Sequence, residues 1–119
     1  MKNFEILFYS KDDGTKPAEA FILGLETKWR ARILLSVALL ADNGYFLREP
    51  YSRSLKDGIF ELRVKADTAI SLVLYFFFVG HKVILTNGFI KKKGCKGASE
   101  LKLAEKYRAE YLSKKENQL

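Results

Sequence analysis

Three apolar runs separated by turn signals lie between positions 57 and 93, and this pattern predicts three antiparallel strands. Residues 60–65 (FELRVK) place apolar and charged side chains on opposite sides, which is the period of a half-buried strand. Residues 72–79 (LVLYFFFV) are apolar at almost every position, which is typical of a strand covered on both faces. Gly80-His81 then forms a tight connection, so residues 83–90 return as the antiparallel neighbour.

A strand and two helices are predicted before these three strands. Residues 4–9 (FEILFY) have strand composition and end at the turn residues 12–14. A short helix follows, with Thr15 as its cap and Gly24 as its end. From Glu26 to Asp42, apolar residues recur at helical spacing until the stop signal Asn43-Gly44.

Two further segments complete the predicted domain. Residues 45–56 have no clear period and contain Pro50, so we expect a loop or an irregular arm. Residues 97–100 open a final helix that ends in a polar tail. The order therefore predicts one α+β domain over residues 1–119, with its helices segregated onto one face of an antiparallel sheet. The predicted core contains Phe60, Leu62, Val64, Leu74 and Phe76, buried together with Trp29 and Ile33. The other face remains for function, and Glu61, Arg63 and Lys65 are predicted to point there.

Composition narrows the classes of function. A chain of 119 residues with 48% hydrophobic residues can bury one core. Its longest apolar run is far below the roughly 20 residues that span a bilayer, and no signal-peptide block is present, so we expect a cytoplasmic protein without a membrane partner. The formal net charge of +7 favours a polyanionic partner such as nucleic acid, although a basic surface also serves solubility.

The sequence gives little evidence for a metal site, a catalytic nucleophile or a phosphate-binding loop. One histidine and one cysteine cannot form a ligand cluster with metal-site spacing. His81 falls in the predicted hairpin turn, and the glycines do not form a phosphate-binding motif that opens a helix. We therefore expect no metal and no cofactor.

Basic side chains are the remaining candidates for chemistry. Cleavage of RNA through its 2′-hydroxyl needs a base, an acid and cations that stabilise the transition state, and it needs no protein nucleophile. A run of lysines is also compatible with a solvated surface, and the basic residues interleaved with Tyr45 and Tyr51 are compatible with a plain connector. The candidate catalytic residues are Arg63, Lys91, Lys92 and Glu61, and the candidate RNA contacts are Arg48, Arg53, Lys56, Lys65 and Lys93. We expect Arg63, Lys91 and Lys92 to share one accessible concave face.

The sequence resembles a known toxin family along nearly its whole length. The stretches DGIFELR (57–63), LYFF (74–77) and LTNGFIKK (85–92), together with Glu100 and Ala104, resemble the phage-derived HigB branch of the RelE/HigB toxin superfamily. Residues 8–22 and 40–58 are similar to the opening of that branch. The resemblance implies a RelE-like fold and a ribosome-dependent mRNA endonuclease. It also implies a type II toxin that a helix-turn-helix antitoxin of the HigA kind holds inactive.

Position by position, the resemblance assigns the basic strand residue of the family to Arg63 and its lysine pair to Lys91 and Lys92. Two positions depart from the pattern. The arginine that usually precedes the LYFF-like segment is replaced by Leu72, and the segment after the lysine pair reads KGCKG (93–97). Loss of a guanidinium removes a phosphate ligand. Two expectations therefore stand: an active mRNA interferase, or a non-catalytic protein of the same fold that binds RNA, ribosomes or a partner. For Glu61, a surface salt bridge is the alternative to a role in orientation or proton transfer.

Overall fold

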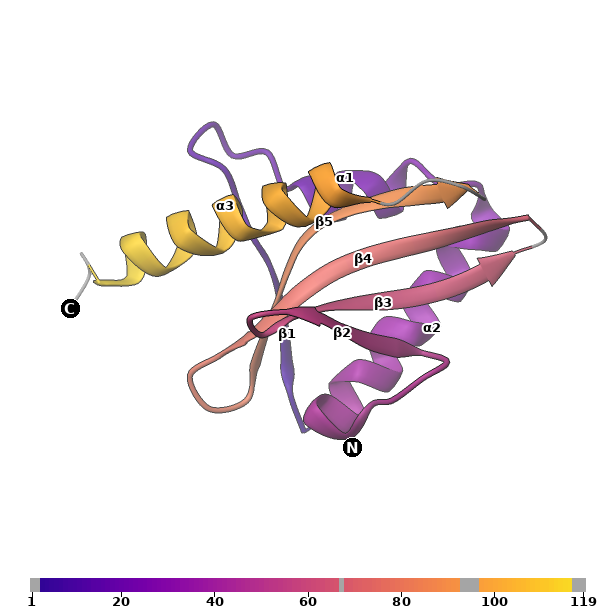
Figure 1. The fold of residues 1–119 in the computed structure, drawn as a ribbon, viewed down its shortest axis with the longest axis horizontal. Coiled ribbons are helices and arrows are strands. Elements are labelled where there is room, and N and C mark those ends of the chain that lie inside the picture. The colour runs from indigo at the N-terminus through magenta and orange to yellow at the C-terminus, as the bar shows by residue number, and fades with distance from the viewer. Residues whose placement is uncertain (1–2, 67, 93–96, 117–119) are drawn as a thin grey trace.

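One five-stranded sheet forms the centre of the α+β fold in the computed structural model, which describes residues 3–66, 68–92 and 97–116 (Figure 1). The strands lie in the order β1-β5-β4-β3-β2. The elements are, in chain order, β1 (Glu5–Phe8), α1 (Pro17–Leu23), α2 (Thr27–Asn43), the 3-10 turn η1 (Gly44–Phe46), β2 (Ser52–Lys56), β3 (Ile59–Ala66), β4 (Ala69–Phe78), β5 (Lys82–Lys92) and α3 (Ala98–Glu116).

The predicted three-stranded meander is confirmed. β3 pairs antiparallel with β4, and β4 pairs antiparallel with β5, with Leu72 aligned between Arg63 and Phe89. The sheet is not the purely antiparallel one that was predicted, because β1 runs parallel to β5 from the Glu5–Lys82 pair onward. β1 therefore occupies one edge of a mixed sheet.

The prediction of a loop over residues 45–56 was wrong for its second half. Residues Ser52–Lys56 form β2, which pairs antiparallel with β3 at the other edge of the sheet. The register shifts between Ser54 and Lys56, so the strand has no regular two-residue period for a sequence pattern to reveal.

The caps of the first two helices agree only in part with the prediction. Gly24 and Gly44 follow the last residues of α1 and α2, as predicted. Thr15 does not cap α1, because the N-cap is Lys16 and no side chain bonds the helix start. Instead, the Thr15 backbone N–H donates to the Asp13 carboxylate, which closes the preceding turn.

Helices cover both faces of the sheet, so the prediction that they share one face was wrong. α1 and α2 lie behind the sheet in Figure 1, where they pack on one face of β3, β4 and β5. α3 crosses the front, where Ala104 and Tyr107 pack against Leu74 and Phe76. The physical reason is that β4 is apolar on both sides and therefore needs a cover on each.

The two faces also divide the predicted core. Leu62 and Val64 are buried together with Ile33 of α2, as expected. Leu74 and Phe76 are buried as well, but they belong to the clusters beneath α3. The two further members of the predicted core, Phe60 and Trp29, are only half-buried.

Polar contacts made by the second half of α3 attach this helix to the rest of the chain. The Tyr9 hydroxyl donates to Glu110, and burial together with this carboxylate raises the pKa of Tyr9. Lys114 forms an ion pair of 2.6 Å with Asp12. Arg108 donates to the backbone carbonyl of Asp57, in the turn between β2 and β3. These contacts hold the second half of α3, whereas the buried Ala104 packs its first half against Ile59 and Leu74, next to the predicted site.

Candidate functional site

The register of the meander brings most of the predicted residues to the α3 side of the sheet. Residues aligned across neighbouring strands project from the same face, and every second residue along a strand shares that face. The rows Arg63–Leu72–Phe89 and Lys65–Ile70–Lys91 therefore face α3. Leu72, Phe89 and Lys91 of these rows border a cleft of about 250 Å³, here called the α3 cleft. It is lined by Arg53, Leu55, Glu61, Leu72, Leu74, Phe89, Lys91, Gly97, Ala98 and Leu101.

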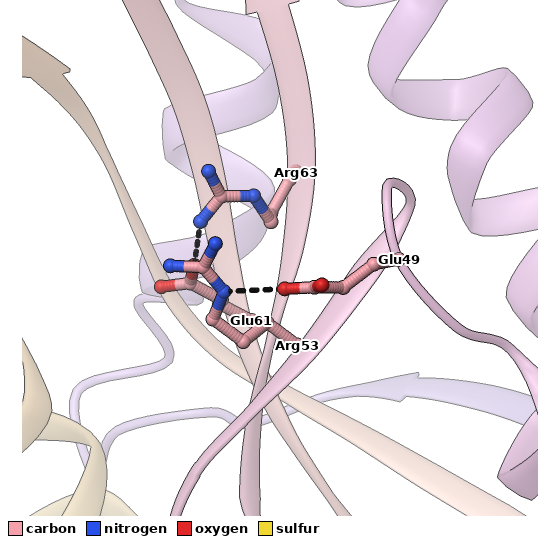
Figure 2. Close-up of polar contacts among 4 residues, drawn as sticks. All are labelled: Glu49, Arg53, Glu61 and Arg63. Atoms are coloured by element: carbon pink, nitrogen blue, oxygen red, sulfur yellow. Dashed lines mark hydrogen bonds and ion pairs between the residues drawn. The ribbon is translucent and has the colours of Figure 1, made fainter.

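Glu61 and Arg63 form an ion pair within the site (Figure 2). An Arg63 guanidinium N–H donates to Glu61 Oε2, and the two side chains are 17% and 8% exposed. The pair lies on one face because the two residues are separated by two positions along β3. Glu61 therefore forms a buried pair with Arg63 itself, rather than the surface salt bridge considered from sequence.

Arg53 extends the cationic side of the site from β2. It aligns with Glu61 across the β2–β3 ladder, and its Nε donates to Glu49 Oε1 at 2.8 Å (Figure 2). The hydrogen bond that Arg53 donates to Glu49 raises the pKa of Arg53, and the nearby charge of Glu61 acts in the same direction. Arg53 also borders a second cleft of about 280 Å³ with Arg63 and Lys65. Glu49 was not predicted, because it lies in an aperiodic segment.

The lysines predicted together are separated by the strand period. Lys91 lines the α3 cleft. Lys92 aligns with Ala69 and follows Lys91 directly, so it projects from the opposite face, and the prediction of one shared face was wrong for it. Lys93 lies outside the described residues.

The other predicted RNA contacts lie around the site. Lys65 is exposed and borders the second cleft. Arg48 is exposed in the segment before β2, next to Phe60 and Ser52. Lys56 is exposed at the end of β2, and neither Arg48 nor Lys56 lines the α3 cleft.

Leu72 faces the α3 cleft, as its alignment with Arg63 requires. Its side chain is 1% exposed and forms part of the apolar floor, together with Leu74 and Phe89. An arginine at this position would project toward the same cleft. The departure from the toxin pattern therefore changes the floor of the site from cationic to apolar.

Two polar residues beside the cleft were not predicted to pair. The Asn87 side-chain amide donates to the backbone carbonyl and to Oε2 of Glu100, at 3.2 and 3.1 Å. The buried Asn87 Oδ1 accepts no hydrogen bond from any described residue. Asn87 thus links β5 to the first turn of α3, and no local sequence pattern reports a contact between two separate elements.

This arrangement is suited to binding an anion and transferring protons. Arg53, Lys91 and Glu61 lie around the apolar floor of the α3 cleft, and Arg63 lines the second cleft, which shares Arg53 with the first. Hydrogen bonds to charged groups are stronger in such surroundings than in open water. Within the described ranges, no group of three or more His, Cys, Asp or Glu side chains could hold a metal ion. No helix in this part of the chain is long and apolar enough to cross a membrane.

Comparison with known proteins identifies the family. No curated protein matches the chain. Residues 20–114 match the family described as Phage derived protein Gp49-like (DUF891), and this match includes every residue that lines the α3 cleft. Gp49-like proteins belong to the RelE/HigB toxin-like group and typically occur in toxin–antitoxin systems. The chain, which presents a basic cleft on an α+β sheet, is therefore a member of the phage-derived Gp49-like family.

Proposed function

We propose that this protein is a HigB-type toxin of a type II toxin–antitoxin pair and that it cleaves mRNA on translating ribosomes. The supporting observation is that Arg53, Glu61 and Lys91 converge on one cleft in a member of a toxin-like family. Arg63 adds a second guanidinium through its pair with Glu61. The set provides cations and proton-transfer groups where a phosphodiester can lie.

The proposed reaction uses the RNA's own 2′-hydroxyl as nucleophile. A base removes the 2′-hydroxyl proton, the bond from O2′ to phosphorus forms, and the bond from phosphorus to O5′ breaks. An acid donates a proton to O5′, so the products are a 2′,3′-cyclic phosphate and a 5′-hydroxyl. Cations next to the non-bridging oxygens stabilise the charge that develops in the transition state.

The residues of the cleft divide these tasks. Arg53 and Arg63 bind the phosphate oxygens, and Lys91 contacts the phosphate and transfers a proton. Glu61 orients Arg63 through their buried pair. Lys92, on the opposite face, takes no part in the reaction.

The toxin's partner in this proposal is a helix-turn-helix antitoxin of the HigA kind. The antitoxin binds the toxin and prevents mRNA cleavage until it is removed. The family's typical occurrence in toxin–antitoxin systems supports this assignment.

The adjacent lysines provide the test. The unmodified chain, the Lys91→Ala variant and the Lys92→Ala variant are each added to a translating extract. The ends of the mRNA transcripts are then mapped. We expect cleavage by the chain, a loss of about 100-fold or more in rate for Lys91→Ala, and little change for Lys92→Ala. Absence of cleavage by the unmodified chain, or equal losses for the two variants, would contradict the proposal.

A second candidate is a non-catalytic protein of the same fold that binds RNA or ribosomes. The apolar Leu72 in the floor of the cleft favours this candidate, because it replaces a guanidinium that could hold two phosphate oxygens. Ribosome binding by the chain without new transcript ends would select it over the nuclease.

A further inference from the structure

Helix α2 carries two apolar stripes on opposite sides, and only one of them meets the sheet. The first stripe follows the helical spacing i, i+3, i+4, i+7, i+8 and faces the core; it consists of Ile33, Ser36, Val37, Leu40 and Ala41. The second has the same spacing and begins two residues earlier, which turns it about 200° around the helix. It consists of Ala31, Leu34, Leu35, Ala38 and Leu39, here called the outer stripe.

The outer stripe faces solvent. Leu34, Leu35 and Leu39 are 49%, 69% and 38% exposed, and none packs against the core clusters. The core-facing stripe, in contrast, contains the buried Ser36. The other four residues of the core-facing stripe are apolar, so it follows the usual rule for a helix on a protein surface. The outer stripe departs from that rule, because three of its leucines are exposed side by side. A helix that is apolar on both sides is typical of one that lies between two layers, and the described chain provides only one layer.

Charged side chains at the N-terminal end of the outer stripe indicate what kind of partner would cover the stripe. Lys28 and Arg32 are exposed there, and both lie over the ring of Trp29, at 5.2 and 5.0 Å from its centroid. The first turn of α2 contains no acidic residue. Cations near a helix N-terminus are disfavoured by the helix dipole, and the N-cap Glu26 provides one carboxylate against the three cations Lys28, Arg30 and Arg32. An acidic partner would relieve the remaining cost.

Charge at the whole-chain level argues against a second copy as the occupant. Each chain has a formal net charge of +7, so two copies in contact would bring together two strongly positive molecules. An acidic partner, in contrast, would be attracted to the basic end of the stripe and would cover its leucines with apolar side chains of its own.

We propose that the outer stripe of α2 is the docking surface for an acidic amphipathic helix of a partner protein. The partner helix places leucine-type side chains on Leu34, Leu35 and Leu39 and its carboxylates beside Lys28 and Arg32. This inference takes its partner from the proposed function, in which an antitoxin binds the chain. α2 and the α3 cleft lie on opposite faces of the sheet, so the docking surface and the cleft can be tested separately (Figure 1).

The probe is the antitoxin of the proposed pair, a purified helix-turn-helix protein, titrated calorimetrically into the unmodified chain and its variants. We expect Leu35→Lys and Leu39→Lys each to weaken binding by about 10- to 100-fold, the change expected when a buried leucine contact is lost. Leu112→Lys is the matched control, because Leu112 on α3 is 38% exposed, like Leu39. Arg32→Glu should weaken binding, whereas Lys102→Glu on α3 should not.

A second measurement does not depend on variants. Leucine methyl resonances of Leu34, Leu35 and Leu39 should shift when the probe is added, while that of Leu112 should not. Without the probe, the Leu39→Lys variant should cleave mRNA at the same rate as the unmodified chain. Loss of docking and loss of cleavage are therefore measured independently.

Three results would overturn the inference. The first is no binding of the probe to the unmodified chain, whether or not the chain cleaves mRNA. The second is equal affinity of Leu39→Lys and Leu112→Lys for the probe. The third is sedimentation of the chain alone as a dimer that Leu35→Lys dissociates, because a second copy would then occupy the stripe.

Discussion

At the residue scale, the site contains two arginine–glutamate pairs in different surroundings. Glu61 and Arg63 are largely buried, whereas Glu49 and Arg53 are 64% and 50% exposed. Water screens the exposed pair, and its contribution to stability is small. Removal of one partner from the buried pair leaves a largely desolvated charge without its counter-ion, which is costly.

The two glutamates therefore provide a matched prediction. We expect Glu61→Gln to lower the free energy of unfolding by about 3 kcal/mol, because it leaves the Arg63 charge without its partner. Glu49→Gln should change the same quantity by less than ~1 kcal/mol. Urea unfolding of the two variants at neutral pH measures both values, and equal effects would show that burial does not separate the pairs.

Leu72 carries the second prediction at this scale. Under the proposed nuclease function, Leu72→Arg should raise mRNA cleavage by roughly 100-fold, because a guanidinium there stabilises the developing phosphate charge. Glu61 lies on the same face of the sheet, where it can balance the new charge. Transcript-end mapping on translating ribosomes measures the rate.

Leu72→Met is the control for this prediction, since it keeps the volume and adds no charge. It should leave the cleavage rate near that of the unmodified chain. If Leu72→Arg lowers the unfolding midpoint and leaves cleavage unchanged, Leu72 acts only as a core residue and the missing-cation explanation is wrong.

At the element scale, the contact between α1 and β5 depends on a missing side chain. A Cβ added to Gly88 of β5 would lie 2.3 Å from Cδ2 of Phe21 in α1, well inside the contact distance of two carbon atoms. The glycine thus lets the helix approach the sheet closely, as glycine in a strand often does.

Gly88→Ala should lower the free energy of unfolding by about 1–3 kcal/mol, because Phe21 must leave its position. In a Phe21→Leu background the same change should cost less, since the smaller side chain leaves room. A double-mutant cycle by urea unfolding measures the coupling. Strict additivity of the two changes would show that Gly88 serves some purpose other than space for Phe21.

At the scale of the whole molecule, the excess of positive charge is distributed over both faces of the sheet. Only the basic side chains that line the α3 cleft can contact the same ligand. A phosphate in the cleft would contact Lys91 and Arg53, whereas Lys92 lies on the face opposite Lys91. Each phosphate contact that forms releases condensed counter-ions, so binding weakens as salt concentration rises.

Binding of a short single-stranded RNA should therefore fall steeply with salt. Lys91→Ala and Arg53→Ala should each reduce the slope of log K against log salt by about 0.7, the value for one contact on a single strand. Lys92→Ala, which removes the same charge, should leave the slope unchanged. Affinity measured by fluorescence anisotropy at several salt concentrations tests this, and salt-independent binding would mean that the basic face serves solubility only.

Local patterns made much of the fold and part of the site predictable. The two-residue period of β3, the apolar run of β4 and the glycines after α1 and α2 act within a few residues, so the strands and helices could be assigned from them. Arg63, Lys91 and Leu72 were likewise found by their place on these strands and by resemblance to the toxin family. Their position along the chain was enough to identify them as candidates.

Contacts between distant segments decided the rest. β2 forms only through pairing with β3, β1 joins β5 across most of the chain, and α3 covers the face that sequence reasoning left open. That cover buries Glu61, and the pairing of β4 with β5 assigns Lys91 and Lys92 to opposite faces. The physical reason is that composition and period specify what an element is, whereas the surface it covers depends on which other apolar faces still need to be buried.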